Sequence, residues 1–418
     1  MQRRFAVILG LLLSGAPSQA QDTLHLTFRQ ADSLLVNRSL ALVVKQADID
    51  RAEAGRVQAR LFQNPQFSSS WVVGGDRPPY LDIGPQGEQV VAVEKLFRIA
   101  GQRSLAMRAA EQRQRVDEAE YAELAAALKR QLHRALVQQY YARRSVAAIS
   151  SQLELLDKLQ GAYGQQYEEG NVSLKEATRL RTAFFALNDQ RINLLRQLNE
   201  LQQQLRDLLG ETATVQAAPT QAELGLPPAI PLPDDTLIAL AQRQRHAAMA
   251  AGEAEEAAAT SLKLERRMAV PDLAIGAEYD QWGNLHPKQT SVTLGFSIPL
   301  FDRNQGGIKR AEADHRQAQA ERRRTQLSVR NQVLLALDNI RVLREQYDAT
   351  SPGLYEQLDQ LSEALVGNYV KNNLKLLEFT DLFESYNTTI IALNQLKADL
   401  HGAYDELEFA IGQDLFGK

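Results

Sequence analysis

Two carboxylates stand three residues apart in the second half of the chain, at Glu378 and Asp381. On a helix this spacing places both side chains on one face, where they could attract cations. Acids early in a helix also interact favourably with its positive N-terminal end, which is the simpler explanation of their presence. The corresponding residues in the first half are Glu176 and Arg179, so only the second half carries two acids. We therefore treat Glu378 and Asp381 as candidate cation-attracting residues.

Other patterns that could perform chemistry are weak. Residues 412–418 contain the glycine and lysine of a phosphate-binding loop, but no Ser or Thr follows the lysine and no strand precedes the glycine. The six histidines stand alone, without a His-x-x-x-His pair or a cysteine partner, so no metal site is predicted. The run 321–324 (ERRR) fits a solvated helix face or a partner contact. We expect no catalytic residue and no cofactor, and hence no enzyme.

The elements that carry these acids occur twice in the chain. Nine residues recur at a constant offset of 202, namely Tyr167/Tyr369, Asn171/Asn373, Leu174/Leu376, Glu176/Glu378, Leu180/Leu382, Leu194/Leu396, Leu198/Leu400, Leu205/Leu407 and Gly210/Gly412. Five residues between Leu34 and Pro65 recur at an offset of 206. Because solenoid repeats are only about 20 to 50 residues long, this duplication indicates two similar halves that act together.

Composition divides the chain into five parts. Residues 1–20 contain two arginines, then an apolar run, and then small residues of the kind found at a signal-peptidase cleavage site. This order predicts a cleaved secretory signal peptide. Residues 21–210 form the first repeat, 211–233 a proline-rich linker, 234–412 the second repeat and 413–418 a C-terminal tail. The chain has no cysteine, and no later segment reaches the apolar length of a transmembrane helix.

Each repeat is predicted to contain a helix, two strands, a very long helix, a tight turn and a further long helix. In the first repeat the helices are expected at about 27–61, 101–163 and 174–209, and the second would be roughly 95 Å long. Apolar residues follow the alternating three- and four-residue steps of a coiled-coil seam along 177–208, interrupted by Arg191, and along 379–410.

The strands of the second repeat alternate cleanly between apolar and polar residues. Leu273, Ile275, Ala277 and Tyr279 share one face of the first strand, and Val292, Leu294, Phe296 and Ile298 share one face of the second. This alternation is typical of an outer-membrane barrel wall, although a soluble hairpin with one buried face gives the same pattern. The strands of the first repeat, at about 66–73 and 88–96, alternate less well.

Four strands per chain cannot close a membrane barrel, because the smallest such barrels have about eight strands. We therefore expect a homotrimer whose twelve strands form one β-barrel in outer-membrane lipid. The long helical hairpins would continue its wall as an α-barrel into the periplasm. The predicted fold class is mainly α with a small β part, and the small net charge of -4 argues against a nucleic-acid partner.

This layout resembles the TolC-like outer-membrane efflux channels, or outer membrane factors, over essentially the whole chain after the signal peptide. The motifs that carry the resemblance are 26–31 (LTFRQA), 61–65 (LFQNP), 298–306 (IPLFDRNQG), Tyr167-x-x-Gly170 with Leu174-x-Glu176, and 377–382 (LEFTDL). Residues 96–103 (LFRIAGQR) resemble the heavy-metal efflux branch more than the drug branch. The second hairpin tip has Asn372 where the family usually has glycine, and asparagine also tolerates a left-handed turn.

The resemblance implies the outer-membrane channel of a tripartite efflux pump. Such a channel is a passive exit duct for substrates, heavy-metal cations among them in the metal branch. A periplasmic adaptor (membrane fusion protein) and an inner-membrane transporter, expected to be of the RND type, would deliver these substrates. The alternatives are a periplasmic adaptor, which would carry one hairpin flanked by lipoyl-like β segments, and a coiled-coil scaffold, which would lack lipid-facing strands.

The resemblance also assigns roles to residues of the two hairpin tips. The residues expected to dock the adaptor are Gly170, Asn171, Asn372 and Asn373. Glu378 and Asp381 match an acidic ring at the periplasmic gate, where three copies would collect six carboxylates. Tyr369 and Glu176, on neighbouring tips, are expected to add a hydrogen bond that holds the closed state.

Overall fold

The computed structural model describes residues 23–74, 81, 89–226, 230, 232–282, 287–350, 353–354, 357–358, 360 and 375–416. The predicted signal peptide lies outside the described residues, as do Tyr369, Asn372 and Asn373. None of the helices in these ranges is long and apolar enough to cross a membrane.

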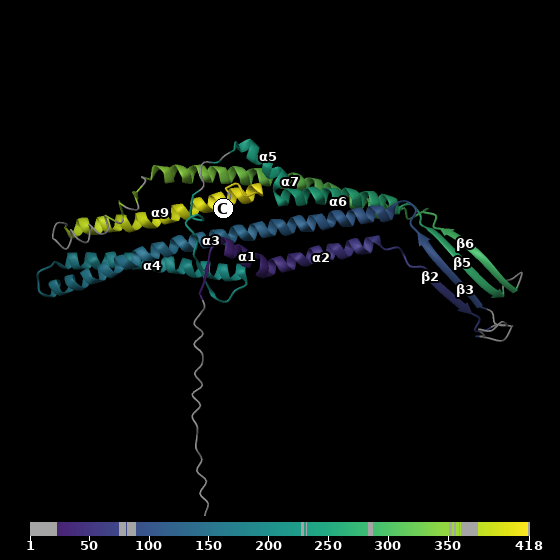
Figure 1. Cartoon of the computed structure of the whole chain (residues 1–418), viewed down its shortest axis with the longest axis horizontal. Coiled ribbons are helices and arrows are strands. Elements are labelled where there is room, and N and C mark those ends of the chain that lie inside the picture. Colours follow the sequence, from purple (N-terminus) through teal and green to yellow (C-terminus); the bar gives the residue numbers. More distant parts are fainter. Residues whose placement is uncertain are drawn as a thin grey trace, which may run out of the picture. The chain divides into compact units, whose positions relative to one another are not determined.

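The described residues are mainly helical (Figure 1). They also include six strands. The helices are α1 (Phe28–Arg38), α2 (Leu40–Arg60), α3 (Gln102–Glu168), α4 (Leu174–Leu209), α5 (Asp234–Gln244), α6 (His246–Met268), α7 (Gln305–Ala349) and α9 (Leu376–Ile411). The strands are β1 (Thr23–Leu26), β2 (Gln66–Trp71), β3 (Gln89–Phe97), β4 (Thr214–Ala217), β5 (Leu273–Trp282) and β6 (Pro287–Phe296). The predicted order of helix, two strands, long helix and further helix is confirmed for the first half.

The prediction of one helical stretch over 27–61 is wrong, because the helix is interrupted at Ser39. The backbone of Ser39 is extended, with φ -64° and ψ 113°, so it cannot continue the helix and instead precedes the first turn of α2. Arg245, which lies 206 residues further on, interrupts the helical stretch of the second half in the same way, with φ -62° and ψ 124°. Both halves therefore have a short helix followed by a longer one.

Four strands form one antiparallel sheet in the order β2-β3-β5-β6. Its central pair, β3 and β5, joins the two halves of the chain through hydrogen bonds from Val90–Asp280 to Phe97–Leu273. Strands β1 and β4 form a separate parallel pair, which was not predicted because each strand has only four residues.

The register of the four-stranded sheet separates an apolar face from a polar face. Cross-strand neighbours share a face, so Phe97, Leu273 and Phe296 form one row, and the adjacent row contains Lys95, Ile275 and Leu294. The rows of the other face contain Gln66, Glu94, Gly276 and Thr293, and then Ser68, Ala92, Glu278 and Ser291. The predicted alternation in the second half is thus confirmed.

Contacts divide the chain into two units, and each combines segments of both halves. The first comprises Met1–Leu35, Ala135–Leu224 and Gly353–Gln395, and the second Val36–Arg134, Gly225–Pro352 and Leu396–Lys418. Because the units do not follow the repeats, they do not test the predicted repeat boundaries. The segments 21–210, 211–233, 234–412 and 413–418 therefore stay predictions.

Each unit has its own hydrophobic core. In the first unit α3, α4 and α9 meet through Ile149, Leu153, Leu156, Leu180, Leu187, Leu376, Phe379 and Phe383. In the second unit α5, α7 and α9 meet through Leu237, Ile238, Ala241, Val329, Val333, Ala336, Leu337, Ile340, Leu400, Ala403, Tyr404, Leu407, Ala410 and Ile411. Residues of both predicted coiled-coil seams therefore lie in these cores.

Candidate functional site

The first hairpin tip connects α3 to α4 through a tight turn. Gly170 has φ +79°, a left-handed conformation that favours glycine. Its backbone N–H donates to the carbonyl oxygen of Tyr167 at 3.0 Å, and the N–H of Asn171 donates to that of Gln166 at 2.8 Å. These bonds close the C-terminus of α3. Gly170 and Asn171 are both exposed, as docking residues must be.

Glu176 caps the N-terminus of α4. The Ser173 hydroxyl accepts a hydrogen bond from the backbone N–H of Glu176 at 3.3 Å, and the Glu176 carboxylate accepts from the N–H of Ser173 at 3.1 Å. The Ser173 hydroxyl also donates to the Glu176 carboxylate at 2.7 Å, and this bond and the one from the Ser173 backbone N–H lower the pKa of the Glu176 carboxyl. The predicted bond between Glu176 and Tyr369 involves a residue outside the described ranges and stays a prediction.

The acidic pair lies in the first two turns of α9, and both carboxylates are exposed. Glu378 Oε2 lies 3.4 Å from the backbone nitrogen of Lys375, which fits the helix-end explanation. Asp381 instead forms an ion pair with Arg179 of α4, at 2.8 Å between Oδ1 and Nη2. The Nε–H of Arg179 also donates to the Thr380 hydroxyl at 2.8 Å. One of the two predicted acids is therefore partnered by a cation of the other hairpin.

The Arg179–Asp381 pair was missed at the level of sequence, although the duplication contained a signal for it. The two residues are separated by the repeat offset of 202, so they occupy equivalent positions of α4 and α9. Helices α4 and α9 share a hydrophobic core, so opposite charges at equivalent positions of the two helices can come into contact. With Glu378, the three side chains carry a net charge of -1 per chain rather than -2.

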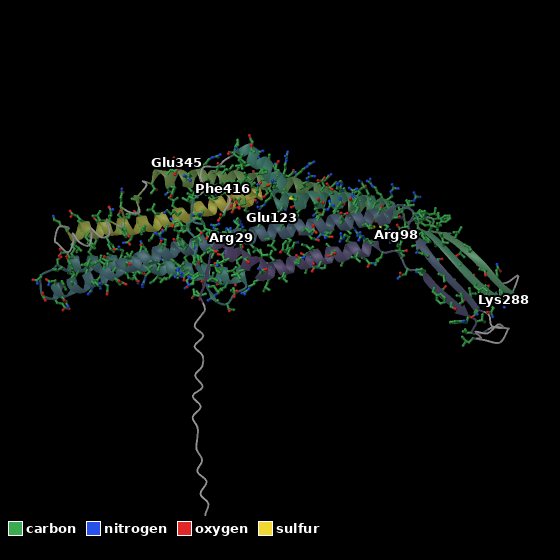
Figure 2. The ribbon with its side chains drawn as sticks, viewed as in Figure 1. Arg29, Arg98, Glu123, Lys288, Glu345 and Phe416 are labelled. Carbon is green, nitrogen blue, oxygen red and sulfur yellow. The ribbon has the colours of Figure 1, made fainter. Side chains whose placement is uncertain are left out.

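A second charged cluster surrounds Arg245, at the break between α5 and α6. Only 3 % of its side chain is exposed, and Nη2 donates to Glu123 Oε1 at 2.7 Å. Its guanidinium carbon lies 3.4 Å from the ring centre of Phe409, and that of Arg130 lies 4.6 Å from the same ring centre. Burial lowers the pKa of the Arg245 guanidinium, and the charge of Glu123 opposes this effect. Glu123 is labelled on α3 in Figure 2.

Gly412, considered above as part of a phosphate loop, packs against this break. Its φ is +79°, and a Cβ there would lie 2.8 Å from the carbonyl oxygen of Gln244 and 2.9 Å from Cα of Arg245. Close backbone approach therefore accounts for this glycine.

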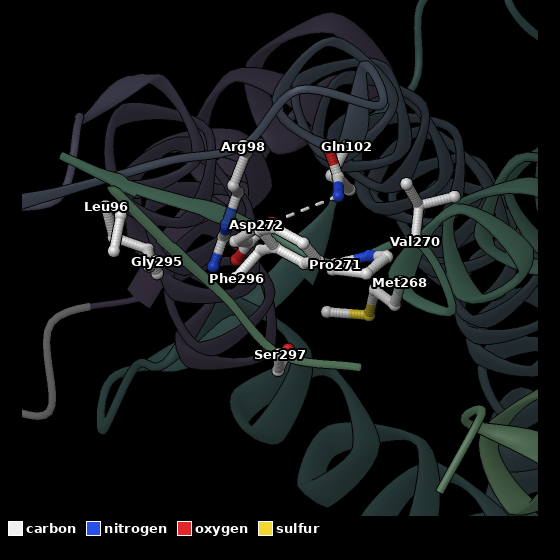
Figure 3. Close-up of a pocket in the computed structure, with 11 residues that line it drawn as sticks. Leu96, Arg98, Gln102, Met268, Val270, Pro271, Asp272, Gly295, Phe296 and Ser297 are labelled. Atoms are coloured by element: carbon white, nitrogen blue, oxygen red, sulfur yellow. Dashed lines mark hydrogen bonds between the residues drawn. The ribbon is translucent and has the colours of Figure 1, made fainter. Parts of the chain in front are cut away.

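A cavity of about 530 Å³ lies where the sheet meets the helices (Figure 3). Its lining residues are Leu96, Arg98, Gln102, Met268, Val270, Pro271, Asp272, Ala274, Gly295, Phe296 and Ser297. Gln102 Nε2 donates to Asp272 Oδ1 at 3.2 Å. Within the described ranges, no three His, Cys, Asp or Glu side chains are grouped to hold a metal ion.

Comparison with known proteins gives the class to which this fold belongs. Residues 237–413 match the family described as outer membrane efflux protein. Over these residues the match agrees with the family predicted from the sequence motifs, that of the outer-membrane efflux channels. The description names transport rather than catalysis.

Among individual proteins, the chain is similar to the cobalt-zinc-cadmium resistance protein CzcC of Cupriavidus metallidurans. The two are 24% identical over 322 residues, which cover 76% of this chain and 74% of CzcC. The fold also matches a crystal structure of a membrane protein from Pseudomonas aeruginosa, with a TM-score of 0.74, 19% identity and 92% of each chain covered. A structure of CusC matches with a TM-score of 0.74, 17% identity and coverage of 95% of this chain and 96% of CusC.

Proposed function

We propose that the chain is the outer-membrane channel of a tripartite efflux pump and acts as a passive exit duct. The observation that carries this proposal is the four-stranded sheet, to which each half contributes two strands. Its apolar face carries exposed Phe67, Val292, Leu294 and Phe296, while its other face is polar. A sheet with one apolar and one polar face is what lipid outside and water inside a barrel require.

The sheet also supports a homotrimer. Strands β2 and β6 are the edges of the sheet in the described chain. Three copies would close a twelve-stranded barrel if β6 of one copy paired with β2 of the next. The long helices of the three copies would continue the wall as an α-barrel in the periplasm. In this proposed arrangement the chain would lie in outer-membrane lipid with a long periplasmic extension.

The hairpin tips are proposed to dock a periplasmic adaptor, itself attached to an inner-membrane transporter of the RND type. Gly170 and Asn171 provide an exposed turn of defined geometry between two helices. Helical hairpins can interleave with a partner's coiled coil by the packing rules of heptad seams. Asn372 and Asn373 are proposed to form the equivalent tip of the second half.

The gate is proposed to lie at the start of α9. Three copies would place six carboxylates, from Glu378 and Asp381, around one opening, and such rings favour cations. The Arg179 contact refines this proposal, because three guanidinium groups would offset half of that charge. Tyr369 and Glu176 are proposed to support the closed state.

Heavy-metal cations are the proposed cargo. The similarity to a cobalt-zinc-cadmium resistance protein and the segment 96–103 support this choice. The cargo would pass through the duct without a binding site of its own. Its specificity and the energy for transport would come from the inner-membrane partner.

A single gel experiment tests the assembly. Outer membranes containing the full chain are dissolved in mild detergent and run with and without boiling. The proposal predicts a band of about three times the chain mass that converts to the monomer on boiling, since membrane barrels resist detergent. A periplasmic adaptor or a coiled-coil scaffold would be released from membranes by carbonate and would show no such conversion.

A gene deletion tests the cargo. The proposal predicts that the deletion lowers tolerance of cobalt, zinc and cadmium and that the wild-type chain restores it.

A further inference from the structure

The geometry points to a binding site for the phosphate group of an anionic phospholipid, formed by Lys95 and Arg103 at the end of the sheet nearest the helices. This inference rests on the proposed function, because it requires the apolar face of the sheet to lie in a bilayer. It adds a specific lipid contact to that function.

Lys95 and Arg103 converge on one aromatic ring. Lys95 Nζ lies 5.6 Å from the ring centre of Phe62 and 5.5 Å from that of Phe97. The guanidinium carbon of Arg103 lies 4.0 Å from the ring centre of Phe62. Both cations therefore lie within 5.6 Å of the centre of the same ring.

No described carboxylate neutralises either cation. Arg103 donates from Nε and Nη2 to the carbonyl oxygen of Arg60, at 3.0 Å and 2.6 Å, which orients the guanidinium without cancelling its charge. Among the described residues, no carboxylate forms an ion pair with Lys95 or Arg103. The Phe62 ring attracts both cations through its π face, but it carries no net charge. Two uncompensated positive charges at one position favour an anion between them.

The two cations lie near the end of the apolar face, which indicates that the anion belongs to a lipid. Lys95 belongs to the apolar face, in the row of Ile275 and Leu294, one row before the end of that face. Lysine and arginine at this depth place their stems against apolar surface and their charged ends at the level of lipid headgroups. An acyl chain lying along the apolar face would bring its phosphate to these cations.

Exposed apolar side chains also occur in the connections that follow this end of the sheet, where Phe97, Leu273 and Phe296 are paired. Leu61, Phe62 and Ile99 are exposed in the connections of the first half, as are Ile298, Leu300 and Phe301 in that of the second. Phe301 is 91 % exposed, which is costly for an aromatic side chain in water. A free phosphate ion would leave this surface in water, whereas a phospholipid would cover it. The occupant we infer is therefore a phospholipid with a net negative headgroup, such as phosphatidylglycerol.

The test measures lipid affinity directly. Full-length protein is delipidated in detergent and titrated with phosphatidylglycerol or phosphatidylcholine, and native mass spectrometry counts the bound lipids. The wild type should bind phosphatidylglycerol more tightly than phosphatidylcholine. Lys95→Gln and Arg103→Gln should each weaken phosphatidylglycerol binding about fivefold, from the attraction of one basic residue to an anionic lipid surface. Phosphatidylcholine binding should change much less.

Arg98→Gln is the matched control. Arg98 is an exposed arginine between Lys95 and Arg103 in the sequence, but it lines the cavity, whose lining includes Leu96 and Ala274 of the other face of the sheet and does not include Phe62. Removing its charge should leave the lipid preference intact. If the Arg103→Gln variant fails to assemble, because Arg103 also binds the carbonyl oxygen of Arg60, the Lys95→Gln variant and the comparison of the two lipids on the wild type still decide the question.

Three results would overturn the inference. The first is equal affinity of the wild type for the two lipids. The second is a loss of phosphatidylglycerol affinity in the Arg98→Gln control as large as that in Lys95→Gln. The third is displacement of phosphatidylglycerol by inorganic phosphate beyond the displacement that sodium chloride of equal ionic strength causes. Planar-bilayer recordings of the wild type separate this inference from the proposed function. Channels without a lipid preference refute the lipid site alone, whereas a wild type that forms no channel refutes both.

Discussion

Arginine substitutions along β6 should destabilise the protein in proportion to their depth in the membrane. The strand has ten residues, and at about 3.4 Å per residue and a tilt of about 45° it spans about 24 Å, the height of a barrel's apolar band. Its middle lies next to Val292. On this geometry Leu294 is about 6 Å and Phe296 about 11 Å from the midplane.

The expected costs follow from these depths. Val292→Arg should cost about 2 to 4 kcal/mol of folding free energy, Leu294→Arg less, and Phe296→Arg about 0 to 1 kcal/mol. Their side chains are almost equally exposed in the single chain, at 73 %, 70 % and 68 %. On a water-exposed surface all three changes would therefore fall within about 0.5 kcal/mol of zero. A cost that falls from Val292→Arg to Phe296→Arg therefore requires surroundings that change along the strand, as they do with depth in a bilayer.

The assay is urea-dependent folding into phosphatidylcholine vesicles, followed by the fraction of heat-resistant trimer on gels. Ser291→Arg is the control, because Ser291 lies on the polar face opposite Glu278 and its replacement should be neutral or mildly favourable. Three small and equal costs along the apolar face would refute the lipid assignment. A Ser291→Arg variant as unstable as Val292→Arg would show that the face does not matter.

Three further predictions concern the helical part. Gly170→Val should abolish efflux while the heat-resistant trimer persists, because a β-branched residue is strained at φ +79° and distorts only the tip; normal metal tolerance in this variant would place the adaptor site elsewhere. In single-channel recordings, Glu378→Ala combined with Asp381→Ala should weaken cation selectivity, whereas Arg179→Ala should strengthen it by freeing Asp381. No change in either variant would mean that these side chains do not face the pore. Arg245→Ala should lower the free energy of unfolding in urea by about 3 kcal/mol, since it breaks a buried ion pair; a loss below about 1 kcal/mol would show that the pair behaves as an exposed one.

The helices and strands could be predicted from local patterns, because a helix or strand with one apolar face repeats its apolar residues with the period of that structure. The strand from Leu273 was recognised because every second residue is apolar, and α4 because its apolar residues step by threes and fours. The breaks at Ser39 and Arg245 could not be located in this way. Neither residue is a glycine or proline, and the apolar pattern continues across both positions.

The charged contacts could be predicted only in part, because they depend on how distant helices are aligned. Sequence reasoning singled out Asp381 but treated it as unpaired, since nothing local indicates that Arg179 lies opposite. Lys95, Phe62 and Arg103 are spread over more than forty residues, and only the tertiary structure brings both cations to the Phe62 ring. Side chains that meet through tertiary packing leave no periodic signal in the sequence.

The two edges of the sheet have a consequence for biogenesis. Under the proposed function, a newly exported single copy would carry an unpaired backbone on β2 and on β6, beside an apolar face that nothing in the described chain covers. Such a surface is prone to aggregate in water, so we expect each copy to need a periplasmic chaperone until its partners arrive. Under the proposed trimer, both edges of a copy are satisfied only when the third copy joins, and the rate of ring closure then rises steeply with the concentration of chains. Halving expression should therefore lower the yield of finished channels by more than half, with the missing copies recovered as degraded or chaperone-bound monomers.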